Sequence, residues 1–164
     1  MLKLRKNKKG FTLVELIVVI AIMAVLAGVV AGVTVSQLSK NTDKTNLSQA
    51  KGIADFVAGE IADTTSSVYG TTGELDATKI IDAIKGQYKS VDISGEATGL
   101  TAAPGKGKFA INIVKTTGNN PKVSSVEILY TEKQSGGKTK GYKVSDNGVI
   151  EQIDNWTTPT PSGN

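Results

Sequence analysis

The stretch KKGFTLVELIVVIAIMAVLAGVVAGVTVS, residues 8–36, decides the architecture of this 164-residue chain. From Phe11 to Val35 the only charged residue is Glu15, so a helix over this segment would be about 37 Å long and apolar on nearly every side. A hydrocarbon core about 30 Å thick requires a helix of that kind. The segment therefore predicts a membrane-spanning helix, and the carboxylate near its start needs an explanation, because an ionisable group in a membrane helix is costly.

The residues before Gly10 are strongly basic. Five cationic side chains stand there, namely Lys3, Arg5, Lys6, Lys8 and Lys9. By the positive-inside rule they hold the amino terminus in the cytoplasm, which places the chain from Ser36 onward outside. Without them, 14 of the 19 basic side chains remain against 15 acidic ones. The net charge of +4 thus belongs to the leader, and no nucleic-acid partner is expected.

Two ordinary interpretations of this segment remain open. A secretory signal peptide would have the same basic start, and the small residues Val29, Val30 and Ala31 would form its cleavage site. An uncleaved single-pass anchor would also look like this. Neither interpretation accounts for Glu15, since signal peptides and anchors have no use for a carboxylate in their apolar run.

The segment Gly10 to Glu15, GFTLVE, resembles the processing motif of type IV prepilins and the related pseudopilins. The resemblance implies that prepilin peptidase cuts between Gly10 and Phe11 on the cytoplasmic side and that the new terminal amine of Phe11 is N-methylated. It also implies that Glu15 pairs with this amine, on the same or a neighbouring subunit, and sets the register between subunits during assembly. Because desolvation offsets much of the Coulombic attraction, the pair would specify register more than add stability.

One feature departs from the pattern of many type IV pilins, which have a helix-breaking proline late in the apolar segment. Here no proline occurs between Phe11 and Ser66, and Gly28 and Gly32 occupy the region instead. Glycine weakens a helix interior by about 1 kcal/mol relative to alanine, so the helix could unwind at these positions in a filament. The G-x-x-x-G spacing is equally typical of close helix packing in membranes, and both interpretations stay open.

The rest of the chain predicts a small α+β domain. Apolar residues recur at helical spacing from Leu47 to Ile61, which extends the first helix as an amphipathic half. A second helix is expected at 74–88, opened by Thr72 or Gly73, and the Gly/Ala/Thr-rich segment 90–106 is expected to be a loop. Strands are expected at 108–115, 123–131, 142–145 and 149–153, the last two joined by a turn at Asn147-Gly148. The fold predicted is a long amino-terminal helix packed on an antiparallel sheet of three or four strands, the pilin fold.

These patterns give the following expected division of the chain. It comprises a cleaved leader 1–10, a transmembrane and filament-core half-helix 11–35, and an extracellular head 36–164, which contains the amphipathic half-helix 36–66, a helix-containing loop region 67–107, the sheet 108–153 and a flexible tail 154–164.

Nothing in the sequence predicts an enzyme, a metal site or a cofactor. Cysteine and histidine are both absent, which removes disulfides, thiol chemistry and the commonest general base. The absence of cysteine also favours, weakly, a Gram-positive bacterium. A calcium site at Asp146-Asn147-Gly148 is disfavoured because too few carboxylates lie nearby in sequence, and SGGKTKG, residues 135–141, lacks the glycine spacing of a phosphate-binding loop.

The sequence and the resemblance together predict a structural subunit, a major pilin, of a type IV pilus used in adhesion, twitching motility or biofilm formation. Its partners would be other copies of itself, prepilin peptidase, and the assembly platform with its ATPase. It would lie in the cytoplasmic membrane, with the amino terminus in the cytoplasm, before assembly and in the surface pilus afterwards. The alternatives are a pseudopilin of a type II secretion system and, from another class, a membrane-anchored surface binding module.

Overall fold

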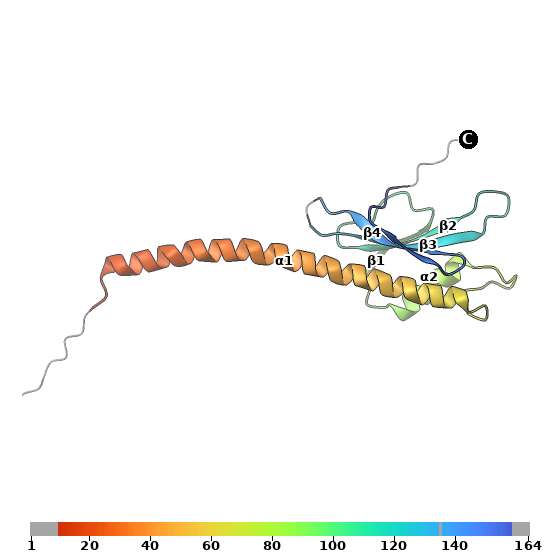
Figure 1. The fold of residues 1–164 in the computed structure, drawn as a ribbon, viewed down its shortest axis with the longest axis horizontal. Coiled ribbons are helices and arrows are strands. Elements are labelled where there is room, and N and C mark those ends of the chain that lie inside the picture. Colours follow the sequence, from red (N-terminus) through yellow and green to blue (C-terminus); the bar gives the residue numbers. More distant parts are fainter. Residues whose placement is uncertain (1–9, 135, 159–164) are drawn as a thin grey trace, which may run out of the picture. The chain divides into compact units, whose positions relative to one another are not determined.

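A computed structural model describes residues 10–134 and 136–158 of the chain, so the expected leader before Gly10 and the end of the expected tail, 159–164, lie outside the described residues. The chain divides into two units, residues 1–38 and residues 39–164. The first helix, α1 (Leu13–Ala62, 50 residues), contributes to both (Figure 1).

In the first unit α1 is apolar and uncovered. Every side chain from Phe11 to Leu38 is exposed, and the most apolar 18-residue window of α1 has no buried residue. By length and composition this helix could cross a membrane. The helix continues without a break through Gly28 and Gly32, and a Cβ atom added to either glycine would meet nothing within 4 Å.

The second unit contains a five-stranded sheet in the order β1-β2-β3-β4-β5. The strands are β1 (Ile93–Thr98), β2 (Phe109–Lys115), β3 (Val123–Thr131), β4 (Thr139–Ser145) and β5 (Ile150–Ile153). The strands β2 to β5 form an antiparallel meander, as the sequence predicts, and Gly148 takes a positive φ of 80° in the turn before β5. The predicted α+β fold, a long helix with a four-stranded antiparallel sheet, is confirmed.

The fifth strand, β1, was not expected, because the sequence predicts a loop over 90–106. It pairs in parallel with β2 at the edge of the sheet, and its register shifts between Ile93 and Gly95. An edge strand is held by backbone hydrogen bonds to one neighbour, so it needs no regular alternation of apolar side chains. An edge strand in a segment rich in Gly, Ala and Thr is therefore not detected from the spacing of apolar residues.

The second helix, α2 (Ala77–Gln87), begins later than predicted. The Asp76 side chain caps it by accepting hydrogen bonds from the backbone N–H groups of Thr78 and Lys79. Asp is a preferred N-cap residue because its carboxylate satisfies N–H groups that have no partner inside the helix. Ile80 and Ile84 are buried and fix the orientation of α2 against the core.

The core lies between the second half of α1, α2 and one face of the sheet. The buried residues of α1 are Asp43, Ala50, Ile53, Ala54, Val57 and Ile61. The apolar ones pack in one cluster with Phe109, Ile111 and Ile113 from β2, which alternate along the strand as predicted. Burial of such apolar surface stabilises the domain by roughly 25 cal/mol per Å².

The opposite face of the sheet is covered as well. Ala110, Leu129 and the single tryptophan, Trp156, form a second buried cluster there. The Trp156 backbone N–H donates to the Thr139 carbonyl at 2.7 Å, and its indole N–H donates to Glu127 Oε2 at 2.9 Å. The prediction of a flexible tail over 154–164 therefore does not hold at Trp156, which packs on the sheet.

Candidate functional site

The segment that carries the predicted processing motif begins α1. Gly10 and Phe11 precede the helix and are exposed, Phe11 by 87%. A Cβ atom added to Gly10 would meet nothing within 4 Å, so no packing within the described chain requires glycine at this position. An accessible, unhindered backbone on either side of the 10–11 peptide bond is what a protease would need.

Glu15 has a partner within this segment. Its Oε2 atom accepts hydrogen bonds from both the backbone N–H and the hydroxyl of Thr12, each at 2.8 Å. In return the Glu15 N–H lies 3.3 Å from Thr12 Oγ1. This reciprocal T-x-x-E arrangement is a capping box, which satisfies two N–H groups at the start of a helix.

The capping box gives Glu15 a local role that sequence reasoning missed. The signal was present, since Thr12 stands three residues before Glu15 at the start of an apolar run. Among the described residues no bond joins Glu15 to Phe11, whose amine would become free only after cleavage. The predicted pairing of Glu15 with that amine stays a prediction, and any test of it has to separate helix capping from charge pairing.

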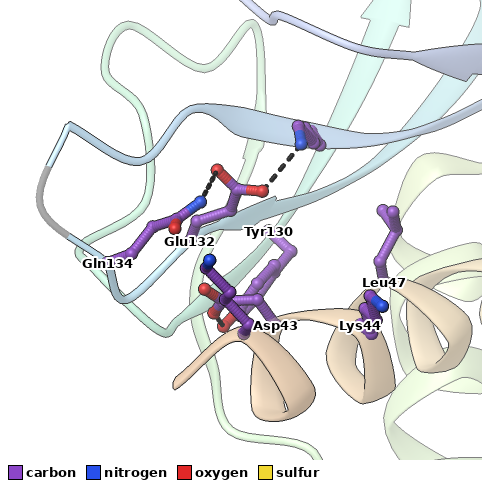
Figure 2. A pocket seen from close by; sticks show the side chains of 8 residues that line it. Asp43, Lys44, Leu47, Tyr130, Glu132 and Gln134 are labelled. Carbon is purple, nitrogen blue, oxygen red and sulfur yellow. Dashed lines mark hydrogen bonds and ion pairs between the residues drawn. The ribbon is translucent and has the colours of Figure 1, made fainter. Parts of the chain in front are cut away.

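A second set of polar residues lies in the unit 39–164. A cavity of about 270 Å³ is lined by α1 and by the end of the β3–β4 hairpin, namely by Lys40, Asp43, Lys44, Leu47, Tyr130, Glu132, Gln134 and Lys140 (Figure 2). Asp43 is only 6% exposed, and its Oδ1 atom accepts from the Tyr130 hydroxyl at 2.6 Å and from the Lys133 N–H at 3.0 Å. Its Oδ2 atom is buried with no hydrogen-bond partner among the described residues.

Asp43 ties the first turns of this half of α1 to the sheet. The position carries a signal in sequence, because 43, 50 and 57 are spaced by seven residues and share the buried face of the helix. A carboxylate on that face must be hydrogen-bonded, since a buried charge without donors is strongly unfavourable. Sequence reasoning missed this residue because its partners, the Tyr130 hydroxyl and the Lys133 N–H, are 87 and 90 residues away along the chain.

Glu132 organises the hairpin beside this cavity. Its carboxylate accepts from Lys140 Nζ at 2.7 Å, from the Lys138 N–H at 3.0 Å and from the Gln134 amide at 3.1 Å. Burial raises the pKa of Glu132, but the hydrogen bonds from Lys140 and Lys138 outweigh it, and the net effect is a lowered pKa. Glu132 therefore stays ionised and neutralises one of the three lysines that line the cavity.

Tyr130 provides a prediction about alkaline pH. Burial, followed by the hydrogen bond to Asp43, raises the pKa of Tyr130 from 10 to about 12. Because the folded-state pKa is raised, its contribution to stability is complete below pH 10 and is lost as the pH rises through 12. We expect absorbance at 295 nm to show a tyrosine that ionises near pH 12 in the folded chain and is absent from Tyr130→Phe.

The same substitution should lower the free energy of unfolding by roughly 1–3 kcal/mol at neutral pH, because Asp43 would keep only one donor. The control is Tyr142→Phe on β4, which removes a hydroxyl outside this cluster. Because burial also raises the pKa of Tyr88, the readout is the difference between the wild type and Tyr130→Phe, and an unchanged titration near pH 12 would contradict the described environment of Tyr130.

Comparison with known proteins supports the processing motif predicted in the amino-terminal segment. Residues 5–31 match the family model described as the prokaryotic N-terminal methylation motif. The chain is also 24% identical over 159 residues to a protein described as "Fimbrial protein" from Dichelobacter nodosus, and the alignment covers 93% of this chain and 85% of that relative. No solved structure matches.

The motif, the similarity over nearly the whole length and the α+β fold all point to one class, because in each respect the chain is similar to type IV pilins. This confirms the resemblance inferred from residues 10–15. The class is structural and not enzymatic, in agreement with the sequence prediction.

Proposed function

We propose that this chain is the major structural subunit of a type IV pilus. Prepilin peptidase would cleave between Gly10 and Phe11 and methylate the new amine, and the processed subunits would polymerise into a helical surface filament. The uncovered apolar half of α1 is the observation that carries this proposal: every side chain from Phe11 to Val35 is exposed. Water cannot be the final surroundings of such a surface, so it requires a bilayer or other copies of the chain.

The processing motif favours a filament over a simple anchor. An anchor needs only the apolar helix. The capping box accounts for Glu15 at the start of α1, but the sequence Gly10-Phe11 immediately before it matches a prepilin cleavage site, which a simple anchor does not need. The relative described as a fimbrial protein supports the same interpretation. In the filament the apolar half-helices would pack inward with the heads outside, and the assembly platform and its ATPase would drive transfer out of the cytoplasmic membrane.

A major subunit is favoured because the described head consists of little beyond helix and sheet. The pseudopilin of a type II secretion system has the same amino-terminal plan, and the surface binding module has the same anchor. Adhesion, twitching motility and biofilm formation are the roles expected of the pilus.

The test is the mass of the amino-terminal peptide of the protein isolated from its own cells. We expect an N-methylated Phe11 in the wild type, and a retained leader in Gly10→Val, because a branched side chain blocks the close approach of the peptidase to the backbone. An intact leader in the wild type, or a terminus at Gly32, would contradict the proposal. Electron microscopy of the same cells distinguishes long surface pili from the short assemblies expected of a pseudopilin.

A further inference from the structure

The cavity beside Asp43 has a cationic rim. Lys40 and Lys44 stand on α1 on either side of Asp43 and are exposed, and neither has a hydrogen-bond or ion-pair partner among residues 10–134 and 136–158. The bonds from Asp43 to Tyr130 and to the Lys133 N–H fix this turn of the helix against the sheet. Figure 2 shows the turn beside the hairpin that carries Glu132 and Gln134. Two unpaired ammonium groups therefore extend from a turn of α1 that is fixed against the sheet.

These lysines lie on one flank of α1. At about 100° per residue, Lys40 and Lys44 are turned roughly 80–120° from the centre of the buried stripe, to one side of it. Within residues 39–62 of α1, all of which the structure describes, the only other charged groups on this flank are Lys51 and Asp55, which neutralise each other through an ion pair at 2.8 Å. The flank therefore has a net positive charge at its amino-terminal end.

The opposite flank of α1 is acidic. On the same helical wheel Glu60 and Asp63 are turned roughly 80–140° to the other side of the buried stripe. Asp63 lies just past the last residue of α1, and its N–H still donates to the Gly59 carbonyl at 3.2 Å. Hydrogen bonds from the Thr65 hydroxyl and N–H lower the pKa of Asp63, and Glu60 accepts from the Ser66 hydroxyl. Both carboxylates are held in place at the carboxyl-terminal end of the helix without a basic partner in the described chain.

We propose that the lysine-rimmed cavity receives the acidic flank, Glu60 and Asp63, of a second copy of this chain. Opposite charges on opposite flanks of one helix become neighbours when parallel copies stand side by side. Lys40 to Glu60 and Lys44 to Asp63 are 20 and 19 residues apart, so the two copies would be displaced by about 30 Å along α1.

The contact is heterologous, because it joins different surfaces of the two copies. Such contacts do not close on themselves when they include a translation, and they generate an open helical array. The inference thus rests on the proposed filament and names a contact within it. Direct docking is necessary, since exposed charges separated by more than about 8 Å are largely screened at physiological ionic strength.

The test reverses the charge of each flank by substitution in the full chain, which is expressed in cells that lack the wild-type protein. We expect the double substitution Lys40→Glu with Lys44→Glu to reduce filaments sheared from the surface at least about tenfold, because like charges across an interface repel. Glu60→Lys with Asp63→Lys should have the same effect. All four substitutions together should restore filaments, since complementarity returns. Lys115→Glu, at the exposed end of β2, reverses a charge away from both flanks and should assemble normally.

Three results would overturn the inference. The first is normal assembly of either double variant. The second is failure of the fourfold variant to assemble although Trp156 fluorescence shows that its head is folded. The third is loss of binding to phosphatidylglycerol vesicles by the lysine variant alone, with no effect of the acidic variant, which would identify lipid headgroups as the partner of the lysines. The proposed function fails separately, because wild-type cells would then lack filaments or an N-methylated Phe11.

Discussion

Cells whose only copy of this protein carries Glu15→Ala are expected to make at least about tenfold fewer surface filaments while the processed protein stays in the membrane. In the proposed assembly the carboxylate meets the amine of Phe11 that cleavage creates. At about 4 Å and an effective dielectric constant near 20, such a pair attracts by roughly 4 kcal/mol before desolvation. The readouts are the quantity of sheared filaments and the mass of the amino-terminal peptide.

The capping box requires two controls for this experiment. Glu15→Gln keeps an oxygen that can accept from the Thr12 N–H, as glutamine does in capping boxes, but removes the charge. Thr12→Ala removes the hydroxyl that bonds Glu15 and keeps the charge. If charge pairing drives assembly, Glu15→Gln should fail as Glu15→Ala does, and Thr12→Ala should still assemble.

The opposite pattern would assign Glu15 to helix capping alone. In that case Glu15→Gln would form filaments at the wild-type level, and Thr12→Ala would be impaired. Normal assembly by Glu15→Ala itself would show that the carboxylate has no role in the filament, neither in capping nor in pairing with the Phe11 amine.

The elements that the sequence predicts well are those in which apolar residues recur at a regular spacing. The apolar run to Val35, the continuation of α1, and the strands β2 and β3 follow directly from the spacing of apolar residues, and the strands agree with the structure to within one residue. Asn147-Gly148 marks the β4–β5 turn because Gly148 adopts a positive φ at no steric cost. Local signals of this kind need no knowledge of tertiary contacts.

What the sequence did not predict depends on partners that are distant along the chain. Asp43 is held by Tyr130, 87 residues away, and Trp156 by Glu127, 29 residues away. The strand β1 exists because β2 offers it a free edge. The capping box is different, since Thr12 and Glu15 alone would have predicted it, whereas the pilin resemblance assigns Glu15 only an assembly role.

The predicted third strand, 142–145, was too short for a related reason. Glycine weakens a strand pattern, yet β4 begins at Thr139 and contains Gly141. Glycine inside a strand is often a position where another backbone approaches closely. Gly141 is such a position, because it pairs with Leu129 of β3 and with Ile153 of β5 in the middle of the meander.

Gly141→Ala should therefore destabilise the head strongly. An added Cβ would lie 1.9 Å from the Ile128 carbonyl oxygen, 2.9 Å from its carbon and 3.1 Å from Leu129 Cα. All three are backbone atoms of a central strand, which can move only by breaking its pairing with β4. We expect a loss of at least about 3 kcal/mol, at the upper end of overpacking costs, and a decrease of roughly 10 °C in the thermal midpoint.

The measurement is the thermal midpoint of the full chain in detergent, followed by the fluorescence of its single tryptophan, Trp156, which lies on the sheet. Gly59→Ala is the matched control, because Gly59 is an exposed position of α1 where an added Cβ meets nothing within 4 Å. Since alanine is the better helix former, this variant should gain up to about 1 kcal/mol. A midpoint for Gly141→Ala equal to that of the wild type would show that β3 and β4 leave room for a Cβ atom at this position, and close backbone approach would then not be the reason for the glycine.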